Sequence, residues 1–268
     1  MKGVYKDLSI EEYHADVSAI SRTGIMEFRK SPAHYWNAYL NPERPAKETT
    51  EAMILGNALH TLVLEPKEFD MRYLIAPAVD RRTKEGKAIY EEFANNSASF
   101  IILTEKQHTQ IESMANAIRK HPQANELVSG ALYEQSIFWD DPHTGIKCKT
   151  RPDIWHENMT VDLKTIISAD ERTFVRSLIQ HGYHMQAAMN REGIYHTGGN
   201  DIKTHVFVCV EKEWPWMVAI YILDQSVLDT AHCLLKNTLT DLKACRESNT
   251  WEGYSVKTIT LPTWAENQ

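Results

Sequence analysis

The sequence predicts an α/β protein in which helices flank a central mixed β-sheet. The order of elements along the 268 residues supports this: a helical first half, three strands, two helices, two more strands and a long helix. An apolar fraction of 43% and seven Trp residues indicate a chain that buries one sizeable core.

The first half of the chain has a helical pattern. Ser21 is a candidate N-cap, and Ser31-Pro32 divides the apolar positions that follow into two short helices. Thr49 or Thr50 begins the next helix. We expect a helix over 51–64, a polar loop over 41–50, a short strand over 71–76, a loop and then a helix within 78–98, and a helix over 104–119.

The second half alternates strands with helices, and a dense turn signal at 140–145 separates its first two strands. We expect one domain over residues 1–268, with a mostly helical part to about 125 and a sheet core from about 126. The expected strands are 131–139, 146–155, 159–166, 204–210 and 216–223, and the expected helices are 169–181, 183–197 and 224–247.

Composition limits the function. The formal net charge is −7, whereas proteins that coat nucleic acid are usually basic because their affinity comes from neutralising phosphates. The charge excludes a general DNA-coating protein, but it is compatible with an enzyme that holds DNA in a local groove containing acidic metal ligands. The four cysteines are scattered, without the spacing of a zinc site or an iron–sulfur cluster.

The sequence has no apolar run long enough to span a bilayer. Residues 1–7 lack the apolar core of a secretory signal. We therefore expect a cytoplasmic protein that does not bind membranes.

The most informative motif is Asp153 followed nine residues later by Asp162-Leu163-Lys164. The two-residue period of a strand places Asp162 and Lys164 on one face and Leu163 on the other. A hairpin joining the strand that carries Asp153 to the strand that carries Asp162 would bring both aspartates together, with Lys164 beside them.

These residue types suit phosphodiester hydrolysis. Hard oxygen ligands hold Mg²⁺, which activates water and stabilises charge on the phosphate. A nearby lysine can orient or deprotonate the water, or offset charge on the phosphate. However, Asp and Lys two residues apart are also a common way to build a solvated sheet face. The spacing alone leaves both interpretations open.

The Arg-Pro-Asp of 151–153 and the Asp-Leu-Lys of 162–164 resemble the signature of the PD-(D/E)xK nucleases, in the RecB and lambda-exonuclease branch. Over nearly its whole length the chain is similar to nuclease domains of the RecE (exodeoxyribonuclease VIII) type. Further segments carry this resemblance in the same order: Gly3-Val4-Tyr5, Glu12-Tyr13-His14, Leu55–His60, Leu64-Glu65-Pro66, Arg81-Arg82-Thr83, Tyr183–Gln186 and Leu261–Ala265.

The resemblance implies a metal site. Its ligands to Mg²⁺ would be His60, Asp153, Asp162 and the carbonyl of Leu163, with Mn²⁺ able to substitute. Lys164 would act on the attacking water. Without the resemblance, a histidine among the apolar neighbours of His60 is more often a hydrogen-bonded core residue than a ligand.

Two further residues are expected at the site. Glu134 is expected on the first strand, sharing its face with Ser136 and Phe138, where relatives place a glutamate; an exposed strand carboxylate is an equally good interpretation. Gln186 corresponds to a glutamine that relatives often carry as GQxxxY. Here Met185 precedes it and residue 190 is not tyrosine, so the tyrosine's role has no assigned residue, although Tyr183 is a candidate.

Contacts to DNA are expected from basic residues and one tyrosine. These candidates are Arg22, Arg29, Lys30, Arg81, Arg82 and Tyr183. Helix-surface charges often have no specific role, so the pattern itself does not distinguish them from ordinary solvated residues.

The resemblance implies an exonuclease for double-stranded DNA ends that digests the 5′-ended strand and leaves 3′ single-stranded tails. It also implies a ring-shaped homo-oligomer, a trimer or tetramer, and a RecT-like single-strand annealing protein as partner in phage or prophage recombination. The alternatives are another PD-(D/E)xK nuclease, such as an endonuclease or a Cas4-like enzyme, and a non-catalytic DNA-binding protein that keeps the fold.

Overall fold

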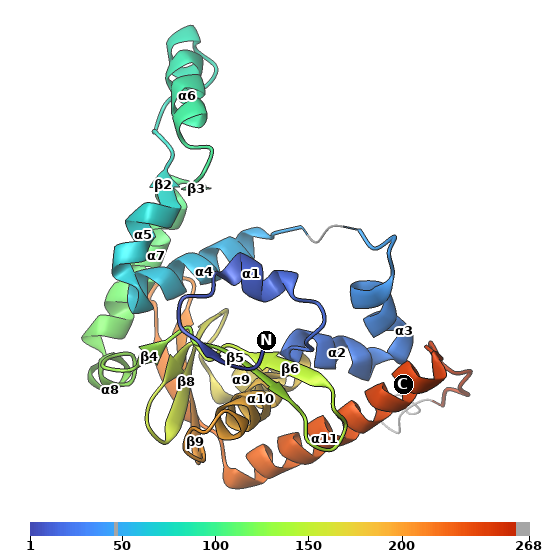
Figure 1. The fold of residues 1–268 in the computed structure, drawn as a ribbon. Helices are drawn as coiled ribbons and strands as arrows, with labels where there is room; N and C mark the ends of the chain where they lie inside the picture. Colours follow the sequence, from blue (N-terminus) through green and yellow to red (C-terminus); the bar gives the residue numbers. More distant parts are fainter. Residues whose placement is uncertain (46–47, 261–268) are drawn as a thin grey trace.

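The computed structural model describes residues 1–45 and 48–260, and it contains mixed β-sheets with helices on both sides (Figure 1). A five-stranded sheet has the order β10-β9-β8-β7-β4, and a three-stranded sheet has the order β1-β5-β6. Within the larger sheet β8 and β9 are parallel and the other neighbours are antiparallel. The predicted α/β class with a central mixed sheet is confirmed. The strands are β1 (Gly3–Tyr5), β2 (Tyr73–Ile75), β3 (Ile101–Leu103), β4 (Leu132–Tyr133), β5 (Ser136–Asp140), β6 (Lys147–Thr150), β7 (Ile154–Trp155), β8 (Met159–Ile166), β9 (Thr204–Glu211) and β10 (Val218–Ile222).

The helices are α1 (Ile10–Ala15), α2 (Arg22–Lys30), α3 (Pro32–Tyr35), the π-helix η1 (Trp36–Leu40), α4 (Glu51–Leu64), α5 (Pro66–Arg72), α6 (Lys84–Asn96), α7 (Glu105–Lys120), α8 (Pro122–Leu127), α9 (Glu171–Gln180), α10 (Tyr183–His196) and α11 (Gln225–Ser248). The longer helices α4, α7, α9, α10 and α11 agree closely with the expected ranges, whereas α5 and α8 were not expected. Because α5 includes residues 71 and 72, the strand expected over 71–76 is reduced to β2. Thr50 caps α4 by accepting a hydrogen bond from the amide of Met53, whereas the Ser21 side chain makes no such bond at the start of α2. In the described part of the chain, no helix is long and apolar enough to cross a membrane.

Two of the predicted strands are each broken into two, which corrects the sequence-based expectation. The expected strand 131–139 becomes β4 and β5, and the expected strand 146–155 becomes β6 and β7. The first break lies at Glu134, whose φ of 50° is rare for a residue with a side chain. Its amide donates to the carbonyl of Asp153 in the second break. Because of this bend the chain passes from one sheet to the other, and Glu134 does not share a strand face with Ser136 and Phe138.

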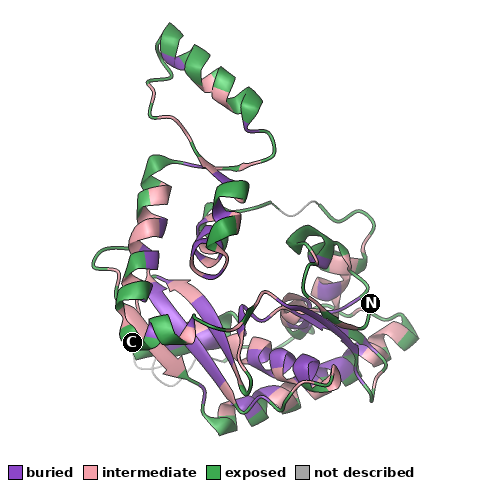
Figure 2. Ribbon diagram, turned by 60° about the vertical axis from the view of Figure 1, so that its left-hand side comes forward, coloured by how far each residue is buried: buried purple, intermediate pink, exposed green. Residues whose placement is uncertain are grey.

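Helices cover both faces of the five-stranded sheet. Leu163 and its alternate neighbours on β8 pack with α4 and α7 in one apolar cluster, and Phe207 on β9 packs with α9 and α10 in another (Figure 1). The strands β5, β8 and β9 and the helix α10 consist mostly of buried residues (Figure 2). The helical first half therefore packs directly on the sheet, and the site is built where these layers meet.

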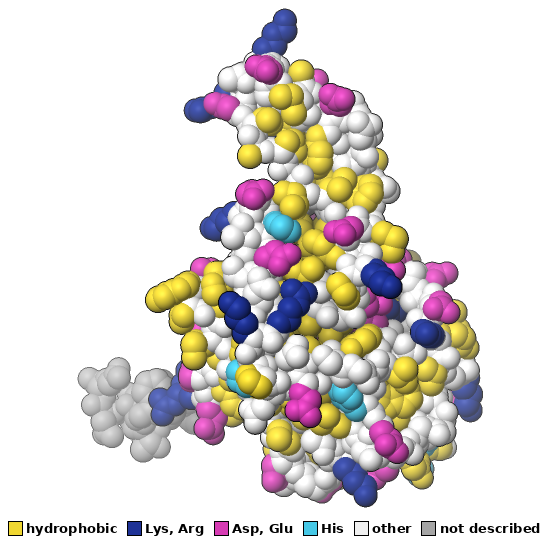
Figure 3. All heavy atoms as spheres, turned by 90° about the vertical axis from the view of Figure 1, so that its left-hand side faces the viewer, with side chains coloured by type: hydrophobic (Ala, Val, Ile, Leu, Met, Phe, Trp, Pro, Cys, Tyr) yellow, Lys and Arg dark blue, Asp and Glu magenta, His cyan; other side chains and the backbone are white. Residues whose placement is uncertain are grey.

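Residues 76–100 project from this body as an arm. Only the short parallel ladder of β2 and β3 joins the arm to α5 and α7 (Figure 1). Its helix α6 is largely exposed (Figure 2), and Gly86 is its one buried residue. Figure 3 shows hydrophobic side chains gathered on this part of the molecule. The exposed hydrophobic residues here are Ile89 on α6, and Ile75 and Ile101 on the β2–β3 ladder at the base of the arm.

Close packing of α10 on the three-stranded sheet requires glycine at position 193. A Cβ there would lie 2.8 Å from the ring of Trp139 and 3.0 Å from the methyl group of Thr150. We expect Gly193→Ala to reduce the free energy of unfolding by about 1–3 kcal/mol, since the buried ring cannot move aside without strain. Urea denaturation followed by tryptophan fluorescence would measure this. Gly253→Ala, where the added Cβ meets nothing within 4 Å, is the control.

Candidate active site

The central motif lies where β7 joins β8. Asp153 directly precedes β7, and one of its carboxylate oxygens accepts a 2.9 Å hydrogen bond from the backbone amide of Leu163 on β8. This bond crosses between antiparallel strands that pair Ile154 with Val161. The predicted hairpin therefore does bring Asp153 next to the Asp162-Leu163-Lys164 segment.

Asp162 lies inside the protein, on the sheet face covered by α10. Its side chain is 0% exposed, and Lys164 Nζ lies 2.7 Å from its Oδ2. The amide nitrogen of Gln186, on α10, donates a 3.0 Å hydrogen bond to its other oxygen, Oδ1. The Lys164 ammonium also lies 5.0 Å from the centre of the Tyr183 ring. The structure thus unites four residues that the sequence placed at the site.

A second group of side chains lies beside the first. His60 on α4, Glu134 and Asp153 each offer a ligand atom within 4.8 Å of the others, and they are a group that could hold a metal ion. His60 Nδ1 is 3.5 Å from Asp153 Oδ2 and 3.9 Å from Glu134 Oε1. Its Nε2 donates to the carbonyl oxygen of Leu163 at 2.7 Å. His60 therefore points to the site and not into the apolar core.

Burial and neighbouring charge shift the acid–base behaviour of this group. Burial disfavours charge on His60, but the carboxylates of Asp153 and Glu134 outweigh it and raise its pKa to about 9. Burial and the negative charge of Asp162 raise the pKa of Asp153 well above its usual value. Glu134 is buried too, yet His60 and Arg151 lower its pKa. The negative charge of the carboxylates around Asp153 is therefore not fully balanced by the neighbouring cations.

Asp162 and Lys164 form the complementary pair. Burial opposes both charges, but Lys164 lowers the pKa of Asp162 to about 2, and Asp162 and Asp153 together raise the pKa of Lys164. Lys164 is therefore an ammonium ion at neutral pH. Such a group can neutralise charge on a phosphate or orient a water molecule, but it cannot accept a proton in this state.

The residues present fit a divalent cation. Asp162 Oδ2 is an ion-pair partner of Lys164 without the geometry of a hydrogen bond, and it and Gln186 Oε1 are buried oxygens without a hydrogen-bond partner. Buried oxygens usually have partners, so Gln186 Oε1, which lies next to the Asp162 carboxylate without a hydrogen bond of its own, needs an explanation. Carboxylate oxygens and a carbonyl are ligands that Mg²⁺ and Mn²⁺ prefer. The donor set therefore suits such an ion.

Metal binding at this site is expected to depend on pH. His60 binds a metal only as the neutral imidazole, so at pH 7 it must first lose the proton that its pKa of about 9 retains. We expect the apparent affinity for Mn²⁺ to rise about tenfold per pH unit from pH 7 towards pH 9 and then to level off. Calorimetric titrations at several pH values would measure this. A pH-independent affinity in this range would show that His60 is not a ligand.

The candidate DNA contacts are only partly brought together. Arg22, whose guanidinium donates to the carbonyl of His181 at 2.9 Å, acts electrostatically on both Lys164 and Tyr183 and so lies at the site. Arg29 and Lys30 are at the far end of α2, where Lys30 pairs with Glu27. The remaining two, Arg81 and Arg82, belong to the projecting arm (Figure 1).

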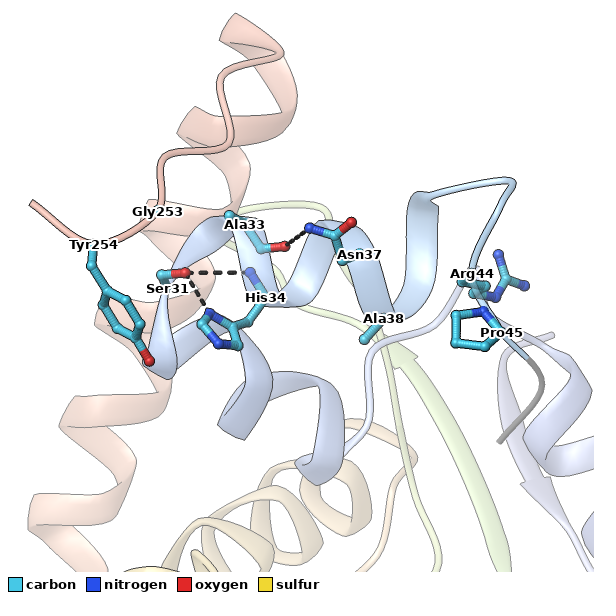
Figure 4. A pocket seen from close by; sticks show the side chains of 9 residues that line it. All are labelled: Ser31, Ala33, His34, Asn37, Ala38, Arg44, Pro45, Gly253 and Tyr254. Carbon is cyan, nitrogen blue, oxygen red and sulfur yellow. Dashed lines mark hydrogen bonds between the residues drawn. The ribbon is translucent and has the colours of Figure 1, made fainter. Parts of the chain in front are cut away.

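A separate pocket lies between α3 and the C-terminal segment (Figure 4). Among the side chains that line it are His34, whose ring nitrogen is 2.7 Å from the Ser31 hydroxyl, Arg44 and Tyr254. None of the acidic site residues lines this pocket. It therefore has no part in the chemistry of the candidate site. The segment 261–265, which contributed to the resemblance, lies outside the described residues.

Two residues near the site were not expected from the sequence. The Arg151 guanidinium donates to Glu134, and the buried His205 on β9 lies near Asp162. Burial lowers the pKa of His205 to about 4, so it is neutral. The strand-like pattern around Glu134 and Arg151 predicted continuous strands, and it gave no sign of the bend that brings Glu134 to Arg151. Nothing in the local pattern around His205 distinguishes it from an ordinary strand residue.

The fold and the Asp153, Asp162 and Lys164 constellation define a protein of the PD-(D/E)xK class, as the motif predicted. The chain belongs to the family described as PDDEXK-like domain of unknown function (DUF3799), which matches residues 21–259. No curated protein matches the sequence.

The solved structures that match this chain include two described as exonucleases. A candidate exonuclease from Eubacterium rectale has 17% sequence identity and a TM-score of 0.63, and the match covers 95% of this chain and 96% of that one. An alkaline exonuclease from Laribacter hongkongensis has 10% identity and a TM-score of 0.35, with 90% and 96% covered. At 17% identity the first similarity supports the fold alone, and the second similarity is too weak to support a conclusion.

Proposed function

We propose that this protein is a divalent-metal-dependent exonuclease for double-stranded DNA that digests the 5′-ended strand. The observation that carries this is the group of potential ligands formed by His60, Glu134 and Asp153, with the Asp162 carboxylate near Asp153 and the Lys164 ammonium paired with Asp162. The class of fold supports a nuclease. The strand polarity rests on the resemblance to RecE-type nuclease domains.

In this proposal, His60, Asp153, Asp162 and the Leu163 carbonyl hold Mg²⁺, and Glu134 is an additional ligand or contacts water through its Oε1. When bound, the ion supplies Lewis-acid stabilisation of the phosphate and an acidified water. Gln186 fixes the orientation of Asp162 through their hydrogen bond. Lys164, held as an ammonium, offsets charge that develops on the phosphate.

Arg22 and Tyr183 are the candidate DNA contacts closest to this chemistry. Arg22 is held by the carbonyl of His181, which leaves its charge near Lys164, where a substrate phosphate would arrive. Tyr183 lies under the Lys164 ammonium and offers a flat surface and a hydroxyl. Arg29, Lys30, Arg81 and Arg82 would then contact the backbone of DNA farther from the cleaved bond.

Linear and covalently closed duplexes distinguish an exonuclease from an endonuclease. We expect the protein with Mg²⁺ to degrade linear duplex to acid-soluble nucleotides and to leave a closed circle of the same sequence intact. Gel electrophoresis of both substrates in one reaction is the measurement. Rapid cutting of the closed circle would contradict the proposal, and hydrolysis of neither, with binding of both, would favour a non-catalytic DNA-binding protein.

We further propose that the protein acts as a ring-shaped trimer or tetramer and supplies 3′ tails to a RecT-like annealing protein. A ring encloses the duplex, so a chain with a net charge of −7 needs less attractive surface to remain on DNA. Sedimentation equilibrium would give the subunit number. If the protein is a monomer and still degrades DNA, the proposed ring is wrong and the proposed nuclease activity stands.

A further inference from the structure

We propose that Arg151 is a positioning residue that fixes Glu134 as a ligand of the metal site. The inference rests on the proposed metal-dependent function and assigns a role within it. Arg151 and Glu134 are joined by a 2.9 Å ion pair between Nε and Oε2, and the two side chains are only 12% and 16% exposed. The remaining carboxylate oxygen, Oε1, lies toward His60 Nδ1, at 3.9 Å.

This division of the two oxygens is the central observation. One oxygen of Glu134 is held by the guanidinium, and the other is directed into the group formed with His60 and Asp153. A carboxylate held in this way presents one oxygen in a fixed direction, which is what a metal ligand requires. Contacts that orient ligands typically contribute 10- to 100-fold to metal affinity.

The backbone of Glu134 needs such support. Its φ of 50° lies in the left-handed region, which is costly for a residue with a side chain. Two contacts hold it there: the amide donates to the carbonyl of Asp153 at 3.1 Å, and the carboxylate binds Arg151. Both contacts lead to the segment 151–153, so this segment sets the position of Glu134 and of Asp153 together.

Arg151 is itself fixed from two other directions. Its Nη1 donates to the Leu8 carbonyl at 2.9 Å and to the Ser136 hydroxyl at 2.8 Å. The guanidinium therefore joins three elements: the N-terminal segment before α1, the start of β5 and the bend at Glu134. A planar fork with several donors can do this, whereas the single ammonium of a lysine cannot reach all three acceptors in the same directions.

A simple charge effect predicts the opposite result. A cation beside a metal site repels the incoming metal, so an Arg151 that acted only through its charge would weaken metal binding. Its removal would then strengthen binding, and lysine would be an adequate replacement. If Arg151 positions Glu134, replacement of Arg151 by methionine or by lysine weakens metal binding. Whether metal affinity rises or falls therefore distinguishes the two explanations.

The experiment is a titration of the full-length protein with Mn²⁺, in which paramagnetic resonance counts the free ion and no DNA is present. We expect Arg151→Met and Arg151→Lys each to bind Mn²⁺ about 10- to 100-fold more weakly than the parent, close to Glu134→Gln. The double variant Arg151→Met with Glu134→Gln should bind within about twofold of Glu134→Gln, because both changes remove the same ligand.

Lys149→Met is the matched control. Lys149, a neighbour on β6, is also a buried cation that holds the N-terminal segment, through the carbonyls of Tyr13 and Asp16. Lys149 therefore binds the N-terminal segment as Arg151 does, but it makes no hydrogen bond to Glu134. We expect Lys149→Met to lower the melting temperature but to keep the parent's affinity for Mn²⁺ within about twofold. Circular dichroism of each variant confirms that it is folded.

Each outcome has one meaning. If the parent binds no Mn²⁺, the proposed metal-dependent function fails and the inference with it. If the parent binds and either folded Arg151 variant binds as tightly as the parent or more tightly, the function stands and the positioning role is wrong. Equal weakening by Lys149→Met would also overturn it, since loss of the N-terminal segment would then explain the effect. If Arg151→Met does not fold, Arg151→Lys, which keeps the buried charge, decides.

Discussion

Asp162→Ala is expected to reduce hydrolysis of linear duplex DNA by about 10³-fold or more. Asp162 is fully buried, pairs with Lys164 and accepts a hydrogen bond from Gln186, so its loss leaves both of these side chains without their partner in the site. Loss of one preorganised charge in a buried catalytic site typically costs about 3–4 kcal/mol of transition-state stabilisation, which corresponds to 10²–10³-fold in rate. Loss of metal affinity adds to this.

Release of labelled nucleotides from a linear duplex at saturating Mg²⁺ would measure the effect. Asp229→Asn is the matched control, since Asp229 lies on the exposed side of α11 and its carboxylate has no role in the site. We expect this control to keep the parent's rate. A folded Asp162→Ala variant with more than a tenth of the parent's activity would remove Asp162 from the catalytic residues.

Lys164→Met is expected to lower turnover by about 10²–10³-fold while metal binding persists. The reason is that Lys164 supplies positive charge and not a ligand atom: Asp162 and Asp153 hold it as an ammonium. Its removal takes a cation away from the carboxylates, so we expect Mn²⁺ to bind at least as tightly as in the parent. Turnover and metal affinity therefore move in different directions.

Single-turnover hydrolysis and Mn²⁺ titration, both on the same preparation, would test this separation. Lys243→Met, on α11, removes a lysine whose partner is the exposed Glu247, and we expect it to change neither quantity. Because Lys164→Met leaves Asp162 without its ion-pair partner, its melting temperature should fall without metal and recover as metal is added. If Lys164→Met hydrolyses DNA at the parent's rate, Lys164 has no catalytic role.

Much of the secondary structure follows from local sequence. The helix over 51–64 and the strand over 159–166 have the bounds that capping and alternation predicted, because each signal is contained within the element itself. The class of fold could be predicted for the same reason. The motif of Asp153, Asp162 and Lys164 was also visible, since neighbours two apart on a strand share a face whatever the tertiary structure.

The two breaks could not be predicted from alternation. Glu134 and the segment 151–153 lie in stretches of strand-like residues, and local preference favours a continuous strand. What decides their shape is the pairing of β5 with β1 and β6, and of β4 with β7, in two different sheets. A strand that must join two sheets has to bend, and the bend places Glu134 in the left-handed region.

The sequence by itself therefore determined the α/β class, the limits of the longer helices and of the strands β8 and β9, and which residue types could form a metal site. Only the tertiary structure decided which oxygens converge. In the folded protein His60 contacts the carbonyl of Leu163 instead of the apolar core. Glu134 lies in a bend between two strands, where it binds Arg151. The physical reason is that capping and alternation act between residues a few positions apart, whereas contacts such as Arg151 with Leu8 and His60 with Leu163 join segments that meet only when the layers pack.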